Sequence, residues 1–132
     1  MLEITDSIWQ DLLAEARRVM KLAYVPYSKY PVGAAALTES GAIVSGCNVE
    51  NASYGLTLCA ECGLVSALAM QGGGRIVAFA CVDGEGNSLT PCGRCRQLLY
   101  EHGGPDLLIW DNGNVLTMSE ILPGAFGPDF LK

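Results

Sequence analysis

Four cysteines stand in two C-x-x-C pairs, and the first pair encloses a carboxylate. The pairs are Cys59-Ala60-Glu61-Cys62 and Cys92-Gly93-Arg94-Cys95. Cysteine thiolates at this spacing are typical ligands of zinc. Four thiolates would close a structural site, whereas three would leave one coordination position for water, whose pKa zinc lowers to about 7. The pairs therefore predict either a structural or a hydrolytic zinc centre.

The placement of the pairs favours the hydrolytic centre. Residues three apart on a helix share a face, so Cys92 and Cys95 can bind one metal ion together. Cys59, at the start of another predicted helix, is then the third ligand, and helix N-termini stabilise thiolates. Glu61 is left as a general acid and base rather than a ligand. The alternative is a zinc-ribbon interaction module that has four Cys ligands and no catalytic activity.

Hydrophobic spacing predicts helices that alternate with apolar strands. The first helix is expected to begin with a capping box of Ser7 and Gln10. Helix 58–70 is apolar nearly all round and is predicted to be buried. The expected helices span 9–23, 58–70 and 91–101, with a short one near Ser119, and the expected strands span 32–37, 42–47, 76–82, 107–110 and 115–117. This order predicts an α/β sandwich with a partly parallel sheet, in which both cysteine pairs open helices.

Composition narrows the class of protein. A chain of 132 residues predicts one domain, 1–132. Its charged fraction of 17% is low, which hints at more burial than one chain provides, and its net charge of -6 argues against nucleic-acid partners. The sequence begins without a signal peptide and has no run apolar enough to span a membrane, so we expect a cytoplasmic protein with no membrane partner. In that reducing compartment, a disulfide framework of the six Cys is disfavoured.

These motifs resemble those of the small, homotetrameric, zinc-dependent cytidine deaminases. The resemblance covers nearly the whole chain, and the C-A-E-C variant is most similar to actinobacterial members. It is carried by C-A-E at 59–61 and P-C-x-x-C at 91–95, by the segments 24–35, 46–54 and 92–97, and by the L-P and F-G-P ending at 122–128. It implies a three-layer α/β/α sandwich with a mixed sheet of about five strands, and active sites that are shared between subunits.

The resemblance also implies the reaction and its residues. Free cytidine and deoxycytidine would be hydrolysed to uridine and deoxyuridine in pyrimidine salvage, by attack of zinc hydroxide on carbon 4 while Glu61 shuttles protons. One Zn²⁺ per subunit would be held by Cys59, Cys92 and Cys95. The implied substrate contacts are Asn48 and Glu50 on the ribose, Tyr30, Ala60 and Tyr54 near the pocket, and Phe126 stacking on the base from a neighbouring subunit.

One departure from the family concerns Cys62. Most members have an arginine there that donates hydrogen bonds to the zinc thiolates. We expect Arg94, Arg96 or backbone amides to replace this donor, and Cys62 to remain a free thiol. Two other reactions compete with cytidine deamination: deamination of another cytosine-bearing small molecule such as a nucleoside antibiotic, and editing of a polynucleotide. The ribose contacts argue against the first, and the acidic charge argues against the second.

Overall fold

A six-stranded mixed sheet forms the middle layer of the computed structural model, which describes residues 3–132. The strands are β1 (Gly33–Thr38), β2 (Ile43–Cys47), β3 (Ile76–Val82), β4 (Ser88–Leu89), β5 (Leu108–Asp111) and β6 (Asn114–Thr117). Their order is β2-β1-β3-β5-β6, with the short β4 paired to β3. Among the strands of residues 3–132, only β3 and β5 pair in parallel. The two-residue strand β4 is what raises the expected five strands to six.

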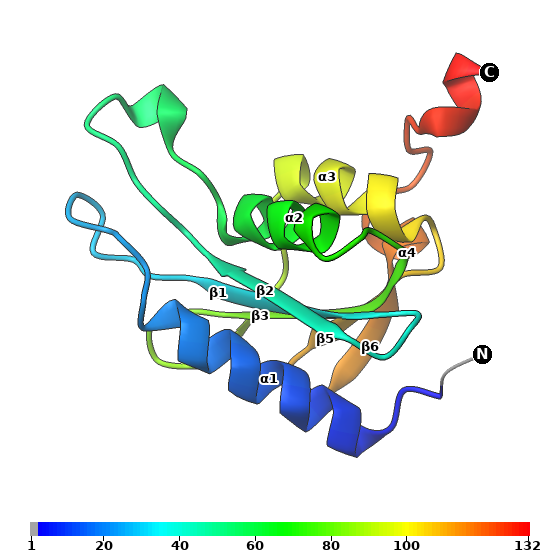
Figure 1. The fold of residues 1–132 in the computed structure, drawn as a ribbon, viewed down its shortest axis with the longest axis horizontal. Coiled ribbons are helices and arrows are strands. Elements are labelled where there is room, and N and C mark those ends of the chain that lie inside the picture. The colour runs from blue at the N-terminus through cyan, green and yellow to red at the C-terminus, as the bar shows by residue number, and fades with distance from the viewer. Residues whose placement is uncertain (1–2) are drawn as a thin grey trace.

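Helices cover both faces of this sheet (Figure 1). Helix α1 (Asp6–Met20) lies on one face, and α2 (Ala60–Met70), α3 (Gly93–Gly103) and α4 (Met118–Ile121) lie on the other. Strand β1 is buried throughout and alternates between the two cores: Ala34 and Ala36 pack toward α2, whereas Ala35 and Leu37 pack toward α1. The expected three-layer α/β/α sandwich is therefore confirmed.

The ends of α1 differ from the sequence prediction. Thr5, rather than Ser7, is the N-cap, and its side chain accepts a hydrogen bond from the backbone N–H of Ile8 at 3.3 Å. The helix ends at Met20 instead of residue 23. The reason is that Tyr24 forms a parallel bridge with Val49, which draws the chain away from the helix axis.

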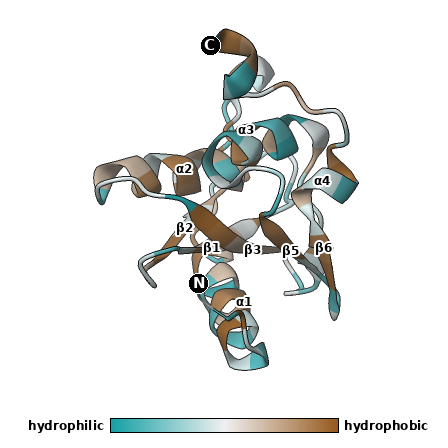
Figure 2. Cartoon of the chain, turned by 90° about the vertical axis from the view of Figure 1, so that its right-hand side faces the viewer, coloured by the Kyte–Doolittle hydropathy of each residue, from teal (hydrophilic) through white to brown (hydrophobic). Residues whose placement is uncertain are grey.

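Helix α2, which was predicted to be buried, is buried on one face only in the single chain. Leu64 and Leu68 are fully buried against the sheet, whereas Met70 is 86% exposed. Figure 2 shows hydrophobic colour on α2 and on the last turn of the chain. Helix α2 has 11 residues, and none of the helices within residues 3–132 is long and apolar enough to cross a bilayer.

Two groups of residues extend beyond the sandwich (Figure 1). Segments 21–32 and 48–58 leave the same end of the sheet together and are joined by bridges from Val49 to Tyr24 and to Leu58. The C-terminal segment continues past α4 and ends in the 3-10 helix Pro128–Leu131, which stands away from the body of the molecule. Exposed aromatic residues are concentrated in these extensions, namely Tyr24, Tyr27, Tyr30, Tyr54, Phe126 and Phe130.

Candidate metal centre and active site

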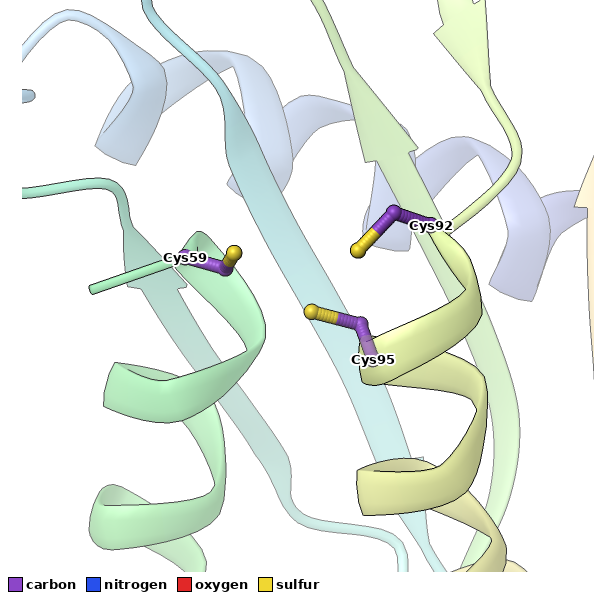
Figure 3. A group of neighbouring side chains, drawn as sticks. All are labelled: Cys59, Cys92 and Cys95. Atoms are coloured by element: carbon purple, nitrogen blue, oxygen red, sulfur yellow. The ribbon is translucent and has the colours of Figure 1, made fainter. Parts of the chain in front are cut away.

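Three thiols meet where α2 and α3 begin. Cys59 is the N-cap of α2, Cys92 is the N-cap of α3, and Cys95 lies in the first turn of α3. Their Sγ atoms all lie within 4.8 Å of one another, and Figure 3 shows the three side chains pointing toward a common centre. Among residues 3–132, Cys62 does not join this group, as the three-ligand hypothesis predicted. All six cysteines are free thiols.

The donor set fits a zinc ion. Thiolates are the soft ligands that zinc prefers, and tetrahedral Zn–S bonds of about 2.3 Å place the sulfur atoms roughly 3.8 Å apart. The three Sγ atoms, within 4.8 Å of one another, can reach that spacing by small side-chain movements. Three protein ligands leave one coordination position open, which distinguishes a catalytic zinc site from a closed structural one.

Backbone amides at the N-terminus of α3 stabilise the Cys92 thiolate. Desolvation acts to raise the pKa of Cys92, but hydrogen bonds from the backbone and side chain of Cys95 and from the backbone of Arg94 bring it below its ordinary value. Burial instead raises the pKa of Cys59. Burial also raises the pKa of Cys95, with further contributions from Glu61 and Cys59. A metal ion must therefore displace protons from Cys59 and Cys95 when it binds.

The arginine side chains do not supply the donor that Cys62 cannot provide. Arg96 directs its guanidinium to two backbone carbonyls, donating from Nε to Pro91 and from Nη1 to Ile121, both at 2.8 Å. Arg94 is exposed and contributes a backbone amide to Cys92. Of the three expected donors, the backbone amides are the ones that reach a thiol, because the first N–H groups of a helix have no intrahelical partner.

Glu61 is a buried carboxyl group beside the thiols. It lies in the first turn of α2, two residues after Cys59, and is only 4% exposed. Desolvation raises the pKa of Glu61, while hydrogen bonds with its own backbone and with the side chain of Cys95 act in the opposite direction. A carboxyl whose pKa is raised toward neutrality can both accept and donate a proton, which is what a general acid and base requires.

The thiols and Glu61 open into a cavity of about 200 Å³. Two residues that sequence reasoning assigned to the substrate, Asn48 and Ala60, line it with them. Further lining residues come from the segments before β1, α2 and α3 and from the ends of β3 and β4: Val32, Thr57, Cys81, Leu89, Thr90 and Pro91. The cavity thus has apolar walls and a polar group of thiols and carboxylate, which is typical of a small-molecule site.

A second cavity, of about 310 Å³, adjoins the first through Thr57, which lines both. Glu50 and Tyr54 line this second cavity, together with Tyr27, whose ring lies 6.0 Å from that of Tyr54. The Oε1 atom of Glu50 accepts hydrogen bonds from the backbone N–H groups of Tyr27 and Ser28, both at 3.1 Å. These two hydrogen bonds fix the Glu50 carboxylate in the second cavity, next to the cavity that the thiols line.

Asn48 joins β2 to the segment before β1. Its Oδ1 accepts a hydrogen bond from the backbone N–H of Val32 at 2.8 Å, and its Nδ2 donates to the carbonyl of Tyr30 at 2.9 Å. The side-chain amide has two N–H groups and two lone pairs, so one of each remains available to a ligand. Asn48 therefore combines a structural function with the capacity to bind a hydroxyl group.

Tyr30 and Phe126 line neither cavity of the single chain. Tyr30 is half exposed and its backbone N–H bonds to the Ser28 hydroxyl. Phe126 is 56% exposed in the C-terminal segment, where its ring stacks on Phe130 at 5.2 Å. The assignment of these two residues to the substrate stays a prediction.

Sequence reasoning missed Thr57, Cys81 and Thr90 as cavity residues. Cys81 reads as a buried strand residue, and it is 1% exposed, yet its Sγ donates to the carbonyl of Leu89 at the cavity wall. Thr57 and Thr90 each stand two residues before a cysteine of the thiol group. That proximity is the only sequence signal that could have singled them out.

Comparisons with known proteins agree with this geometry. Residues 7–110 match the family described as the cytidine and deoxycytidylate deaminase zinc-binding region. The chain is 56% identical over 126 residues to a cytidine deaminase of Mycobacterium tuberculosis, a match that covers 96% of this chain and 95% of the relative. It is 42% identical over 123 residues to a cytidine deaminase of Halalkalibacterium halodurans, with 89% and 92% of the two chains covered.

Solved structures give the same relationship. The crystal structure of cytidine deaminase from M. tuberculosis superposes with a TM-score of 0.89 at 56% identity, covering 93% of this chain and 98% of the other. That of cytidine deaminase from Burkholderia pseudomallei has a TM-score of 0.80 at 37% identity, covering 89% and 98%. The sandwich described above is therefore shared over nearly the full length of both relatives.

Proposed function

This chain belongs to the cytidine deaminase family of zinc-dependent hydrolases, and on that premise we propose that it converts free cytidine and deoxycytidine to uridine and deoxyuridine. Residues 1–132 form the catalytic unit, which acts in pyrimidine salvage in the cytoplasm. The observation that carries the proposal is the group of three thiols at two helix N-termini, with the buried carboxyl of Glu61 beside them in one cavity.

Glu61 handles the protons of the reaction. Cys59, Cys92 and Cys95 would hold one zinc ion per subunit, which would supply a Lewis acid that activates the attacking water. Glu61 accepts a proton from the attacking water and delivers it to the ring nitrogen next to carbon 4. It then transfers the second proton of that water to the amino group, which leaves as ammonia. The raised pKa of Glu61 supports both directions of transfer.

Glu50 and Asn48 favour a nucleoside without a phosphate group. Hydrogen bonds from Ser28, with further contributions from the backbone of Tyr27 and the charge of Lys29, hold the pKa of Glu50 below its ordinary value. Glu50 is therefore ionised at neutral pH and can accept hydrogen bonds from ribose hydroxyls, as Asn48 can. The same negative charge disfavours a 5′-phosphate in the cavity that Glu50 lines.

We further propose that the active unit is a homotetramer whose sites are completed by neighbouring subunits. Apolar surface is exposed on the outer face of α2, on the segment around Tyr54 and on the C-terminal segment. Phe126 reaches neither cavity of its own chain, so a neighbour's cavity is where its ring can stack on a base. Tyr30 and Tyr54 lie in the extensions that such a contact would cover.

An ultraviolet absorbance assay on the zinc-loaded protein tests the substrate. We expect turnover of cytidine and deoxycytidine, and a kcat/KM for cytidine monophosphate lower by at least two orders of magnitude. No turnover of either nucleoside would overturn the proposal, and faster turnover of the monophosphate would move the assignment to a nucleotide deaminase. Activity on a single-stranded cytosine-containing oligonucleotide is expected to be absent because the chain is acidic.

A further inference from the structure

Residues 118–132 are fastened to α3 by three contacts that the proposed reaction does not use. Arg96 donates from Nη1 to the carbonyl of Ile121, and Gln97 donates from Nε2 to the carbonyl of Phe126, both at 2.8 Å. Gly127 is buried against the ring of Tyr100, where an added Cβ would lie 2.6 Å from Cε1. These α3 residues lie at neighbouring positions on one face of the helix, and that face holds the segment that leads to Phe126.

Arg96 makes a second hydrogen bond, which connects it to the segment that carries Cys92. Its Nε donates at 2.8 Å to the carbonyl of Pro91, the residue that precedes the thiol ligand Cys92 and lines the cavity. The guanidinium group presents its donors in a rigid planar fork. One side chain therefore fixes the distance between the Pro91 carbonyl and the Ile121 carbonyl.

In the part of the chain that the structure describes, neither the Pro91 carbonyl nor the Ile121 carbonyl accepts a hydrogen bond from a backbone group that could replace the one from Arg96. Within residues 3–132, no backbone N–H donates to Pro91 or to Ile121, and no ion pair engages Arg96. Removal of the guanidinium would leave two partly buried acceptors unpaired, which is costly for the native state. The partly buried charge of Arg96 is thus stabilised by these two carbonyl dipoles.

We propose that Arg96 is a positioning residue that holds the Pro91–Cys92 segment and the C-terminal segment in a fixed position relative to each other. Through Pro91 it fixes a metal ligand of its own subunit, and through Ile121 it fixes the segment that carries Phe126. The part of the inference that concerns Phe126 rests on the proposed function, whereas the part that concerns Cys92 rests on the hydrogen bonds alone. Arg96 lines neither of the two cavities.

The test uses full-length Arg96→Ala, with two readouts that need no nucleoside. The first is the zinc dissociation constant from competition with a chromophoric chelator, and the second is amide hydrogen exchange over residues 122–131. We expect zinc binding to weaken about 10–100-fold, the range found when a partner that orients a metal ligand is removed. We also expect exchange over 122–131 to become about ten-fold faster, since one of its anchors is gone.

Matched variants separate positioning from charge and from general instability. Arg94→Ala removes the same charge from an exposed site of the same helix, and both readouts should stay within two-fold of the unaltered protein. Gln97→Ala should speed exchange over 122–131 and leave zinc binding unchanged. Leu13→Ala lies in α1 on the opposite face of the sheet, and it should lower the melting temperature without altering either local readout.

Arg96→Lys keeps the inference testable if Arg96→Ala does not fold. A single ammonium group cannot reproduce the fork, so its zinc affinity should still fall several-fold. Zinc affinity and exchange in the Arg96 variants equal to those of Arg94→Ala would overturn the inference. If those readouts change as expected but the unaltered protein does not deaminate cytidine, the proposed function fails and the link between Arg96 and Cys92 stands.

Discussion

Gly46 of β2 lies directly against the backbone of α2, where a Cβ added to Gly46 would stand 2.5 Å from the amide nitrogen of Leu64 and closer still to the carbonyl of Ala60. A strand and a helix here meet without any side chain between them. The contact falls on the first turns of α2, which carry Glu61 and follow Cys59. Gly46 therefore sets the distance between the sheet and the N-terminus of α2, and with it the position of Cys59 and Glu61.

Gly46→Ala is accordingly expected to destabilise the protein by about 1–3 kcal/mol, because the added methyl group must push α2 away from β2. Zinc binding should weaken as well, since Cys59 moves with the helix. Gly63→Ala is the matched control on the facing helix: its Cβ would lie 3.6 Å from the Cα of Gly46, an ordinary contact. There, alanine in place of glycine should raise helix stability by roughly 0.5–1 kcal/mol. Equal losses in urea unfolding of the two variants would contradict this account.

The layers and the group of three thiols could be predicted from the sequence because both depend on short-range patterns. Apolar runs identified the buried strands β1 and β3, and the C-x-x-C pairs at predicted helix starts indicated that Cys59, Cys92 and Cys95 lie together. The strand β4 was not predicted because a strand of two residues is too short to show an alternation of apolar and polar residues.

Contacts between distant parts of the chain could not be predicted from one sequence. Nothing in the residues around Arg96 indicates that its guanidinium bonds to Ile121, which lies 25 positions further along. The exposed face of α2 was misjudged for a similar reason: composition reports that a helix is apolar, but not whether its own chain or a neighbouring one covers it. The same holds for Phe126, because an exposed ring does not by itself indicate which group it stacks on.

Substitution of single cysteines should separate the ligands from Cys62. Cys62→Ser is expected to keep one zinc ion per subunit, because Cys62 lies outside the thiol group in residues 3–132. Cys95→Ser should lose the zinc ion. It should therefore also lose the stabilisation that zinc gives the unaltered protein, about 2.7 kcal/mol when free zinc is at a hundred times its Kd, which is seen as a higher melting temperature. Metal analysis and thermal melts with and without chelator measure both. X-ray absorption that shows four sulfur neighbours of zinc would contradict the three-ligand site.

Glu61→Gln should leave the fold and the zinc content unchanged and lower kcat by about 10²–10⁴-fold or more, since the amide cannot carry protons. Glu101→Gln, an exposed change of the same kind near the end of α3, should have no effect on kcat. The measurements are steady-state kinetics on cytidine and metal analysis of the same preparations. Turnover of the Glu61 variant within a few-fold of the unaltered enzyme would refute the proton-transfer role.

Glu15 should make stability depend on pH in the acid range. The hydrogen bond from Arg18, with further contributions from the Ser45 hydroxyl at 2.6 Å and the charge of Arg18, lowers the pKa of Glu15. A carboxyl with a lowered folded-state pKa adds stability above its unfolded pKa of about 4.3 and loses it as pH falls through the folded value. Glu15→Gln should therefore cost about 0.5–1 kcal/mol at pH 7, the range for such partly exposed pairs, and nothing at strongly acid pH. Asp11→Asn, an exposed change on the same helix, should cost nothing at either pH in chemical unfolding.

A subunit-mixing experiment tests whether Phe126 serves a neighbour. Phe126→Ala should lower kcat/KM for cytidine about ten-fold or more, because stacking of a base on an aromatic ring is worth about 1–3 kcal/mol. In a mixed oligomer, a Phe126→Ala subunit keeps Glu61, and a Glu61→Gln subunit can lend it Phe126. Each such pairing restores a complete site, so the mixture should exceed the summed activity of its parents. A mixture of Glu61→Gln with Cys59→Ser should show no gain, because each lesion removes a group that lines its own subunit's cavity. If Phe126 instead folds back onto its own subunit's site, the first mixture will show no gain either, and light scattering will report whether the oligomer had formed.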